Sequence, residues 1–375
     1  MTYSSEHYLE HGDYLLALRR LMDISLDSGN PAHIKKAVEL SRRYRKALHT
    51  TAENVAAGFK ADAQRILAEF PEQSASAEQS VLVKADKISK VYRRGNFSLK
   101  PISIELAAGE ITGVVGENGN GKTTLMRCIA GQLATDSGRL EYAGINANDH
   151  YQIKSTVAFI PQRIPRWFGR LRDNLHFSAA LSGITGEENE LLVDFMLERF
   201  GLAEYAELNW NQISSGYRTR FEIARVLLMR PQVMILDEPL ANLDINAQQT
   251  LLTDLGFLAK SPTRPLAVLL TSQQLHEVEK VANRVLLIRN GECIFGSAAN
   301  DVHALGFALE VETTSPRESV QAALAETDAQ IQFNGGFFTL ISHTHTAQQL
   351  LKLLVDAGIS IVYCRDISNS TKRLF

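Results

Sequence analysis

Apolar residues in the first 75 positions recur at spacings of three and four residues. One stripe contains Ile34, Ala37, Leu40, Tyr44 and Ala47. A second stripe contains Val55, Phe59, Ala63, Ile66 and Phe70. Because residues three and four apart share one face of an α-helix, each stripe predicts an amphipathic helix that buries that face.

Turn and capping signals divide this region further. Gly29-Asn30-Pro31 is typical of a turn between two helices. Thr50 and Glu53 fit a capping box at the start of the next helix. We therefore expect an N-terminal helical domain over residues 1–75, with about three helices. Residues 71–80 are small and polar, which is typical of a linker.

From Val81 onward, short apolar runs alternate with helical patterns. The runs are VLVKADKIS, ISIEL, ITGVV, VMILD, LAVLL and RVLLI. Apolar strands that alternate with helices predict an α/β fold with a mostly parallel sheet, covered on both faces. A mainly helical stretch at about 172–230 interrupts the pattern and predicts an inserted subdomain. We assign residues 76–302 to this domain.

A separate C-terminal domain is expected over residues 303–375. FALEVETT, AQIQF, FFTLI and ISIVYC read as strands, and helical patterns cover 316–325 and 347–357. The resulting order β-α-β-β-α-β is that of a ferredoxin-like α+β fold.

Composition excludes several classes of protein. The 375 residues carry 39 basic and 42 acidic side chains, a net charge of -3 that offers no general attraction for nucleic acid. The apolar runs fall far short of the roughly 20 residues that span a bilayer. Cys128, Cys293 and Cys364 form no metal-spaced pair, which favours a reducing compartment. The acidic N-terminus, MTYSSEHYLEHGDY, does not read as a signal peptide.

The strongest chemical signal is the glycine-rich segment 116–123, GENGNGKT, between an apolar strand and a helix. It matches the P-loop pattern in full. Glycines let backbone amides turn inward around a phosphate, and the helix N-terminus adds partial positive charge. We expect Lys122 to neutralise β- and γ-phosphate oxygens and Thr123 to ligate Mg²⁺.

A second signal is VMILDEP at residues 233–239. The apolar strand delivers Asp237 and Glu238 at its carboxyl end, where open α/β sheets bind ligands. Asp237 is placed to hold Mg²⁺ through water, and Glu238 to act as general base on the attacking water.

Residues 81–300 resemble the ATP-binding cassette of ABC transporters over the length of that domain. Ile213-Ser214-Ser215-Gly216-Tyr217 stands where the family has its signature loop. Gln162 is similar to the Q-loop glutamine, Ala241-Asn242-Leu243-Asp244 to the D-loop, and Tyr92 to the aromatic that stacks on adenine. The order and spacing of these motifs carry the resemblance.

The resemblance implies a site shared by two cassettes in a nucleotide-sandwich dimer, formed with a second copy or a related cassette. ATP is expected to contact Tyr92, Gly116, Asn118, Gly119, Asn120, Gly121, Lys122, Thr123 and Thr124, with Ser214, Ser215 and Gly216 from the opposite subunit. The implied metal ligands are Thr123, Gln162 and, through water, Asp237. The implied catalytic residues are Glu238, Gln273 and Gln162.

Three positions depart from the family pattern. The signature has Ser215 in place of the usual glycine and Tyr217 in place of the usual glutamine. The switch histidine falls on Gln273, whose amide can donate a hydrogen bond but cannot carry a proton. We therefore expect hydrolysis to be slowed and not abolished, because Glu238 is present. His276 is a weaker candidate for the missing histidine.

Some assignments have rivals. Tyr92 could instead pack in its strand, with Phe97 as the stacking residue. Ser-Ser-Gly at 214–216 is also a common turn and helix cap. The basic run at 42–46 could contact anionic headgroups, although such runs more often face solvent.

By resemblance, the segment from Gln162 to Phe168 meets a polytopic membrane subunit. Aromatics among arginines are common at interfaces; a solvated basic loop with one buried aromatic is the alternative, and a nucleic-acid patch is a weaker third interpretation. The residues concerned are Arg163, Arg166, Trp167, Phe168, Arg170 and Arg172.

The C-terminal domain resembles the one that follows the cassette in ABC-2-type exporter ATPases. The expectation is an ATP-hydrolysing subunit of an ABC export complex, cytoplasmic and held to the inner face of the membrane by its partner, with no nucleic acid bound. A soluble ABC ATPase without a membrane path and a nucleotide-gated scaffold without turnover are the alternatives.

Overall fold

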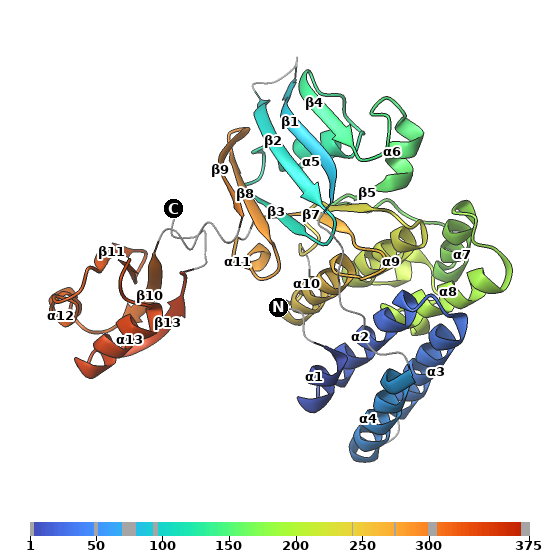
Figure 1. The fold of residues 1–375 in the computed structure, drawn as a ribbon, viewed down its shortest axis with the longest axis horizontal. Coiled ribbons are helices and arrows are strands. Elements are labelled where there is room, and N and C mark those ends of the chain that lie inside the picture. The colour runs from blue at the N-terminus through green and yellow to red at the C-terminus, as the bar shows by residue number, and fades with distance from the viewer. Residues whose placement is uncertain are drawn as a thin grey trace.

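The computed structural model describes residues 4–48, 52–69, 80–92, 97–241, 243–273, 275–298 and 306–368. Figure 1 shows N-terminal helices in blue, a central α/β region and a C-terminal unit in red. No helix in the described ranges is both long and apolar enough to cross a membrane. The expected Thr50 cap lies outside these ranges.

The central sheet has six strands in the order β5-β6-β7-β3-β8-β9. All neighbouring pairs are parallel except β8 and β9. Their bounds are β3 Ile111–Val115, β5 Val157–Ile160, β6 Val233–Leu236, β7 Ala267–Ser272, β8 Arg284–Arg289 and β9 Glu292–Ala298. Every residue of β3, β6 and β7 is buried, which agrees with a parallel sheet covered on both faces.

A smaller antiparallel sheet with the order β2-β1-β4 lies beside the central one (Figure 1). Its strands are β1 Val81–Val91, β2 Ser98–Ala107 and β4 Ser137–Tyr142. Helix α5 (Lys122–Ile129) contributes Leu125, Met126 and Ile129 to one apolar core with residues of both sheets. Burial of this helix against both sheets fixes the direction of its N-terminus.

The remaining helices of the central region follow in chain order. They are α6 His150–Thr156, α7 Leu171–Leu181, α8 Gly186–Arg199, α9 Ser215–Leu228, α10 Ile245–Ala259 and α11 Leu275–Val278, with 3-10 turns η1 Ala203–Tyr205 and η2 Trp210–Gln212. The expected helical insertion therefore corresponds to α7 through α9.

The N-terminal bundle contains four described helices, one more than the sequence suggested. They are α1 Ser5–Glu10, α2 Tyr14–Asp27, α3 Pro31–Leu48 and α4 Ala52–Glu69. The extra helix, α1, is only six residues long and is capped by Ser4. Such a short segment lacks the repeated apolar stripe by which the others were predicted.

The bundle shares its core with the central region. Leu21 and Met22 of α2 belong to the same buried apolar cluster as Phe195 of α8 and Leu255 of α10. The Tyr8 ring meets Phe257 of α10 edge to face, with centroids 6.0 Å apart. The bundle is therefore packed onto the cassette and is not a separate globule.

A buried ionic network crosses the same junction. Arg199, at the end of α8, is 1% exposed. Its Nε and Nη2 donate to the two carboxylate oxygens of Asp23 in α2, each at 2.8 Å, and its Nη1 donates to Asp254 of α10 at 2.8 Å. Arg19 of α2 donates to the other oxygen of Asp254 at 2.6 Å. One arginine thus ties three segments together.

The basic run of α3 faces acids of the same chain. Arg42 pairs with Asp194 at 2.6 Å and Arg45 with Glu198 at 2.8 Å, both acids on α8. Arg43 pairs with Asp62 of α4 at 2.8 Å. The first two pairs join the bundle to α8, and the third joins α3 to α4. Arg42, Arg43 and Arg45, which were candidates for contact with lipid headgroups or solvent, thus have acidic partners in the same chain.

The C-terminal unit is a four-stranded antiparallel sheet with the order β11-β12-β10-β13 and two helices. Its elements are β10 Phe307–Thr313, α12 Arg317–Ala323, β11 Gln330–Asn334, β12 Phe337–Ser342, α13 Ala347–Asp356 and β13 Ile361–Asp366. Both the element order and the strand order are those of a ferredoxin-like fold. Helix α13 is capped by Thr346 and Gln349 in a reciprocal capping box.

We predict that Arg199→Ala lowers the free energy of unfolding by about 3–5 kcal/mol, because it removes the cation from buried Asp23 and leaves Asp254 with Arg19 alone. Arg43→Ala is the matched control, since its ion pair is largely exposed and should contribute about 0–1 kcal/mol. Urea denaturation followed by circular dichroism measures both. Equal shifts for the two variants would contradict a structural role for the network.

Candidate functional site

The glycine-rich segment forms a tight loop between β3 and α5. Gly121 has φ +101°, and a Cβ atom there would lie 2.6 Å from the Phe97 ring. Gly116 is equally confined, because a Cβ atom would lie 2.3 Å from the carbonyl oxygen of Ile288. Helix α5 begins at Lys122 without a side-chain cap, so its first N–H groups remain available to an anion.

Lys122 folds back into this loop. Its Nζ donates to the carbonyl oxygens of Gly116 at 2.6 Å and Glu117 at 3.2 Å. The same atom lies 3.1 Å from Oε1 of Glu238, and both side chains are less than 10% exposed. The ammonium group is thus held where the loop closes, in reach of an anion bound by the loop.

The carboxyl end of β6 places two acids beside the loop. Asp237 accepts hydrogen bonds from the Thr123 hydroxyl at 2.8 Å and the Thr271 hydroxyl at 3.0 Å. Thr271 lies in β7 and also accepts from the backbone N–H of Glu238 at 2.8 Å. Hydroxyl and carboxylate oxygens together form a donor set suited to a hard cation.

Glu238 follows β6 in an unusual backbone conformation, with φ +50°. The left-handed region is disfavoured for residues with a Cβ atom, and such strain concentrates at functional sites. Its Oε2 accepts a hydrogen bond from Nε2 of Gln273 at 2.9 Å, at the end of β7. Glu238 is therefore held between Lys122 and Gln273, two of the residues predicted to act with it.

These groups border one open cavity. It is lined by Phe97, Glu117, Asn118, Gly119, Gly121, Lys122, Thr123, Thr124, Gln162 and Glu238. The predicted residues Gly116, Asp237 and Gln273 contact its lining residues through the hydrogen bonds described above. Of the P-loop candidates, Asn120 turns away, because its Oδ1 accepts from the backbone N–H of Asn290 at 3.0 Å.

Both candidate stacking aromatics lie at the rim. Phe97 lines the cavity and packs on Gly121. Tyr92 lies just beyond β1, 38% exposed, with its hydroxyl 3.3 Å from that of Thr124. The two ring centroids are 6.3 Å apart. Tyr92 is therefore not buried within its strand, and the two aromatics form one apolar edge.

The signature residues Ser214, Ser215 and Gly216 start helix α9 and do not line this cavity. Ser214 is the N-cap residue, yet its side chain makes no capping hydrogen bond. Gly216 faces the D-loop, because a Cβ atom there would lie 3.1 Å from Leu243. The helix start thus lies outside the cavity of its own chain.

Several other predicted residues are placed by their contacts. Tyr217 stacks on Tyr205 with centroids 4.1 Å apart. Asp244 caps α10 by accepting from the N–H of Ala247 at 2.9 Å. Asn242 and the side chain of His276 lie outside the described residues.

The predicted interface after Gln162 is part buried and part open. The Trp167 indole donates to Glu222 at 3.1 Å and lies under the Arg225 guanidinium, 4.7 Å away. Phe168, by contrast, is 78% exposed, with Arg166 5.2 Å from its ring. Arg170 and Arg172 pair with acids of the same chain.

Sequence reasoning missed Thr271. Its hydroxyl bonds both Asp237 and Glu238, and it therefore sets the geometry of the two acids. A threonine at the end of an otherwise apolar run, two residues before Gln273, was the available signal.

Comparison with known proteins agrees with this geometry. The profile of the ABC transporter family matches residues 99–241. The uncharacterized ABC transporter ATP-binding protein YxlF of Bacillus subtilis is 30% identical over 56% of this chain and 69% of its own length. The daunorubicin resistance ATP-binding protein DrrA3 of Streptomyces coeruleorubidus is 30% identical over 55% of this chain and 65% of its own.

Importer subunits are similar as well. The phosphonates import ATP-binding protein PhnC of Treponema denticola is 26% identical, over 65% of this chain and its entire length. Among solved structures, the dimeric ATP-binding cassette MJ0796 bound to ADP and Pi aligns with TM-score 0.53 and 21% identity, covering 58% of this chain and 98% of that one. With its phosphate loop, paired acids and these relatives, the chain belongs to the ABC transporter family as an ATP-binding ATPase subunit.

Proposed function

We propose that this chain binds and hydrolyses ATP to energise an ABC export complex, acting as a nucleotide-sandwich dimer with separate membrane subunits. The observation that carries the proposal is the contact of the Lys122 ammonium with Glu238 at the mouth of the phosphate loop. The cation for a triphosphate and the base for water thus meet in one cavity.

Phosphate binding follows from the loop itself. Positive potential where the β- and γ-phosphates would lie comes from the backbone N–H groups of the loop, the N-terminus of α5 and Lys122. An incoming γ-phosphate competes with Glu238 for Lys122, so binding would release the carboxylate. Adenine would rest on the edge formed by Tyr92 and Phe97.

The cation site fits Mg²⁺. Mg²⁺ prefers oxygen ligands, and these are offered by the Thr123 hydroxyl, the Asp237 carboxylate and the Gln162 amide. Thr123 and Gln162 line the cavity, and Asp237 is hydrogen-bonded to Thr123. When bound, Mg²⁺ would neutralise charge on the β- and γ-phosphates. Thr271 would keep Asp237 oriented toward it.

Water activation is assigned to Glu238. Its carboxylate, once free of Lys122, accepts a proton from the attacking water, while Gln273 holds it in place through the 2.9 Å hydrogen bond. Because an amide cannot carry the proton that a histidine could, slow turnover is expected. That substitution also favours a second candidate function, a nucleotide-gated scaffold that binds ATP without hydrolysis.

The dimer proposal rests on where the signature residues lie. Ser214 and Gly216 start α9 away from the cavity of their own chain, with the Ser214 hydroxyl making no cap. Two copies related by a two-fold axis could each place this helix start against the γ-phosphate bound by the other.

The membrane partner is proposed to dock beside Gln162. Phe168 is 78% exposed, and Phe177 and Leu181 of the neighbouring helix α7 are also exposed, at 59% and 65%. Exposed aromatics beside arginines are typical of interface cores. This contact would hold the chain at the cytoplasmic face. Export is proposed because the C-terminal domain resembles that of ABC-2-type exporter ATPases, and the relatives include both a daunorubicin resistance and a phosphonates import ATP-binding protein.

Lys122→Ala should weaken Mg-ATP binding at least tenfold, because charge-assisted hydrogen bonds to phosphate are lost. Isothermal titration calorimetry measures the affinity. Lys100→Ala is the matched control, since Lys100 forms an exposed pair with Glu292 and lies outside the cavity. Unchanged affinity in the Lys122 variant would contradict the assignment of the phosphate site.

Glu238→Gln should lower the rate of ATP-dependent phosphate release at least a hundredfold. Because the bound ATP is then not hydrolysed, the variant should accumulate as an ATP-bound dimer. Phosphate release and light scattering on the purified full chain give both readouts. Wild-type release that vanishes in the variant excludes the scaffold. Absence of release from the wild type would favour the scaffold, and failure of the variant to dimerise with ATP would refute the sandwich.

Phe168→Ser should reduce co-purification of a polytopic membrane protein from detergent-solubilised membranes, without changing ATP affinity. Phe333→Ser, which alters an exposed aromatic in the C-terminal domain, is the control. If the wild-type chain retains no membrane protein, the soluble-ATPase alternative is favoured over transport.

A further inference from the structure

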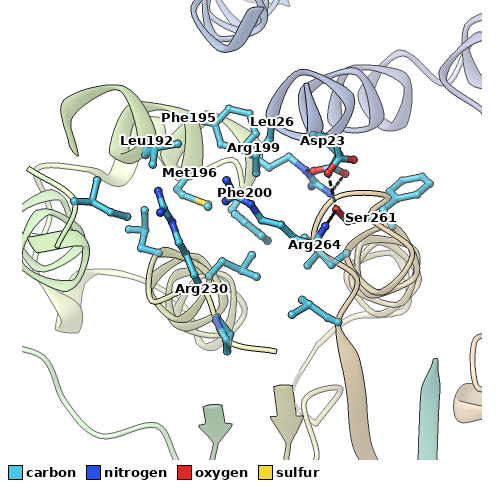
Figure 2. A pocket seen from close by; sticks show the side chains of 18 residues that line it. Asp23, Leu26, Leu192, Phe195, Met196, Arg199, Phe200, Arg230, Ser261 and Arg264 are labelled. Atoms are coloured by element: carbon cyan, nitrogen blue, oxygen red, sulfur yellow. Dashed lines mark hydrogen bonds and ion pairs between the residues drawn. The ribbon is translucent and has the colours of Figure 1, made fainter. Parts of the chain in front are cut away.

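A second cavity lies where the N-terminal bundle meets the cassette (Figure 2). Its walls come from α2, α8, the end of α9, α10 and the loop between α10 and β7. Most of its lining is apolar: Leu26, Leu192, Phe195, Met196, Leu227 and Leu258 are representative. This second cavity has no lining residue in common with the cavity beside the phosphate loop, where ATP is proposed to bind.

Two arginines reach into this apolar setting. Figure 2 shows Arg230 rising from the end of α9 and Arg264 extending from the α10–β7 loop, both toward α8. Arg230 has one ion pair, at 2.7 Å to Glu188, and both partners are about half exposed. Within the described part of the chain, the Arg264 guanidinium forms no ion pair or hydrogen bond.

The two acids of the cavity are engaged elsewhere. Asp23 is held by both nitrogens of Arg199 that face it. Oδ1 of Asp27 accepts hydrogen bonds from the hydroxyls of Ser261, at 2.5 Å, and Thr263, at 2.9 Å. Arg264 is exposed, so water solvates part of its side chain. Partial burial, followed by repulsion from Arg230, lowers the pKa of Arg264, whereas Asp27 and Glu188 raise it.

The apolar surface continues beyond the arginines. An adjoining cavity shares Leu26, Leu192, Arg230 and Arg264 with the first and extends to Pro31 and Ile34 of α3. The two cavities are thus neighbours, and the adjoining one is also lined by Lys35, Glu187 and Glu188. A purely polar anion would leave the apolar lining unused, and a neutral apolar molecule would leave Arg264 unpaired.

We propose that this cavity binds a small amphipathic anion, with its acidic head group on Arg264 and Arg230 and its hydrocarbon body against α2 and α8. Both carboxylate and phosphate monoester head groups match the planar guanidinium fork. The apolar body supplies binding free energy in proportion to the area it buries. Such a ligand would contact the bundle and the cassette at once, and would stabilise their junction.

Titration calorimetry of the full-length protein tests the proposal with four probes: octanoate, octyl phosphate, 1-octanol and acetate. The first two have the head and the tail, 1-octanol lacks the charge and acetate lacks the tail. We expect saturable binding of octanoate, octyl phosphate or both, at least tenfold tighter than 1-octanol or acetate, with a matching rise in melting temperature. Which anionic probe binds better identifies the head group.

Arg264→Gln should lower the affinity for the anionic probe at least tenfold and leave the affinity for ATP unchanged. Arg139→Gln, which changes an exposed arginine of β4, should leave anion binding as in the wild type. Leu26→Trp fills a half-buried position shared by both cavities and should block the tail.

Three results would overturn the proposal. They are the absence of binding by both anionic probes, equal binding of 1-octanol, and anion binding that survives both Arg264→Gln and Leu26→Trp. Circular dichroism of each variant confirms that the fold is retained. If Arg264→Gln loses the fold, Arg264→Lys, which keeps the charge and loses the fork, gives the same comparison.

Discussion

The enclosed ammonium of Lys122 is the constraint on which the rest of the catalytic region depends. A cation that is 5% exposed must have anionic or carbonyl partners, and here the loop carbonyls of Gly116 and Glu117 and the carboxylate of Glu238 supply them. That arrangement requires β3 and β6 to end at the same edge of one parallel sheet, with β7 between them carrying Thr271. The apolar strands thus serve to bring charged groups from distant parts of the chain together.

A second enclosed cation organises the opposite side of the molecule. Arg199 joins α2, α8 and α10, so one helix of the insertion (α8) and the helix that follows the paired acids (α10) are both held to the N-terminal bundle. Motion of the α7–α9 region against the sheet must either carry this network along or distort it. The cavity proposed for an amphipathic anion borders the same network, because Asp23 and Arg199 are among its lining residues.

Much of the fold was readable from the sequence, because strand runs, the phosphate loop and the ferredoxin-like order are local patterns. The expected family and α/β class are confirmed by the profile match and the relatives. What escaped prediction was set by distant partners. Arg42 and Arg45 find their acids some 150 residues away on α8, and the Asn120 side chain accepts a hydrogen bond from the β8–β9 turn. The site assignments themselves stay predictions, since geometry brings most of them together without testing their chemistry.

Arg199 also limits how freely this cassette could be exchanged between proteins. Its carboxylate partners Asp23 and Asp254 come from different halves of the sequence, and only the second belongs to the cassette. A chimera that grafts residues 76–302 onto another N-terminus would retain an interior guanidinium with half of its neutralising charge. Modular redesign of this chain must therefore transplant α2 together with the cassette, or replace the buried arginine.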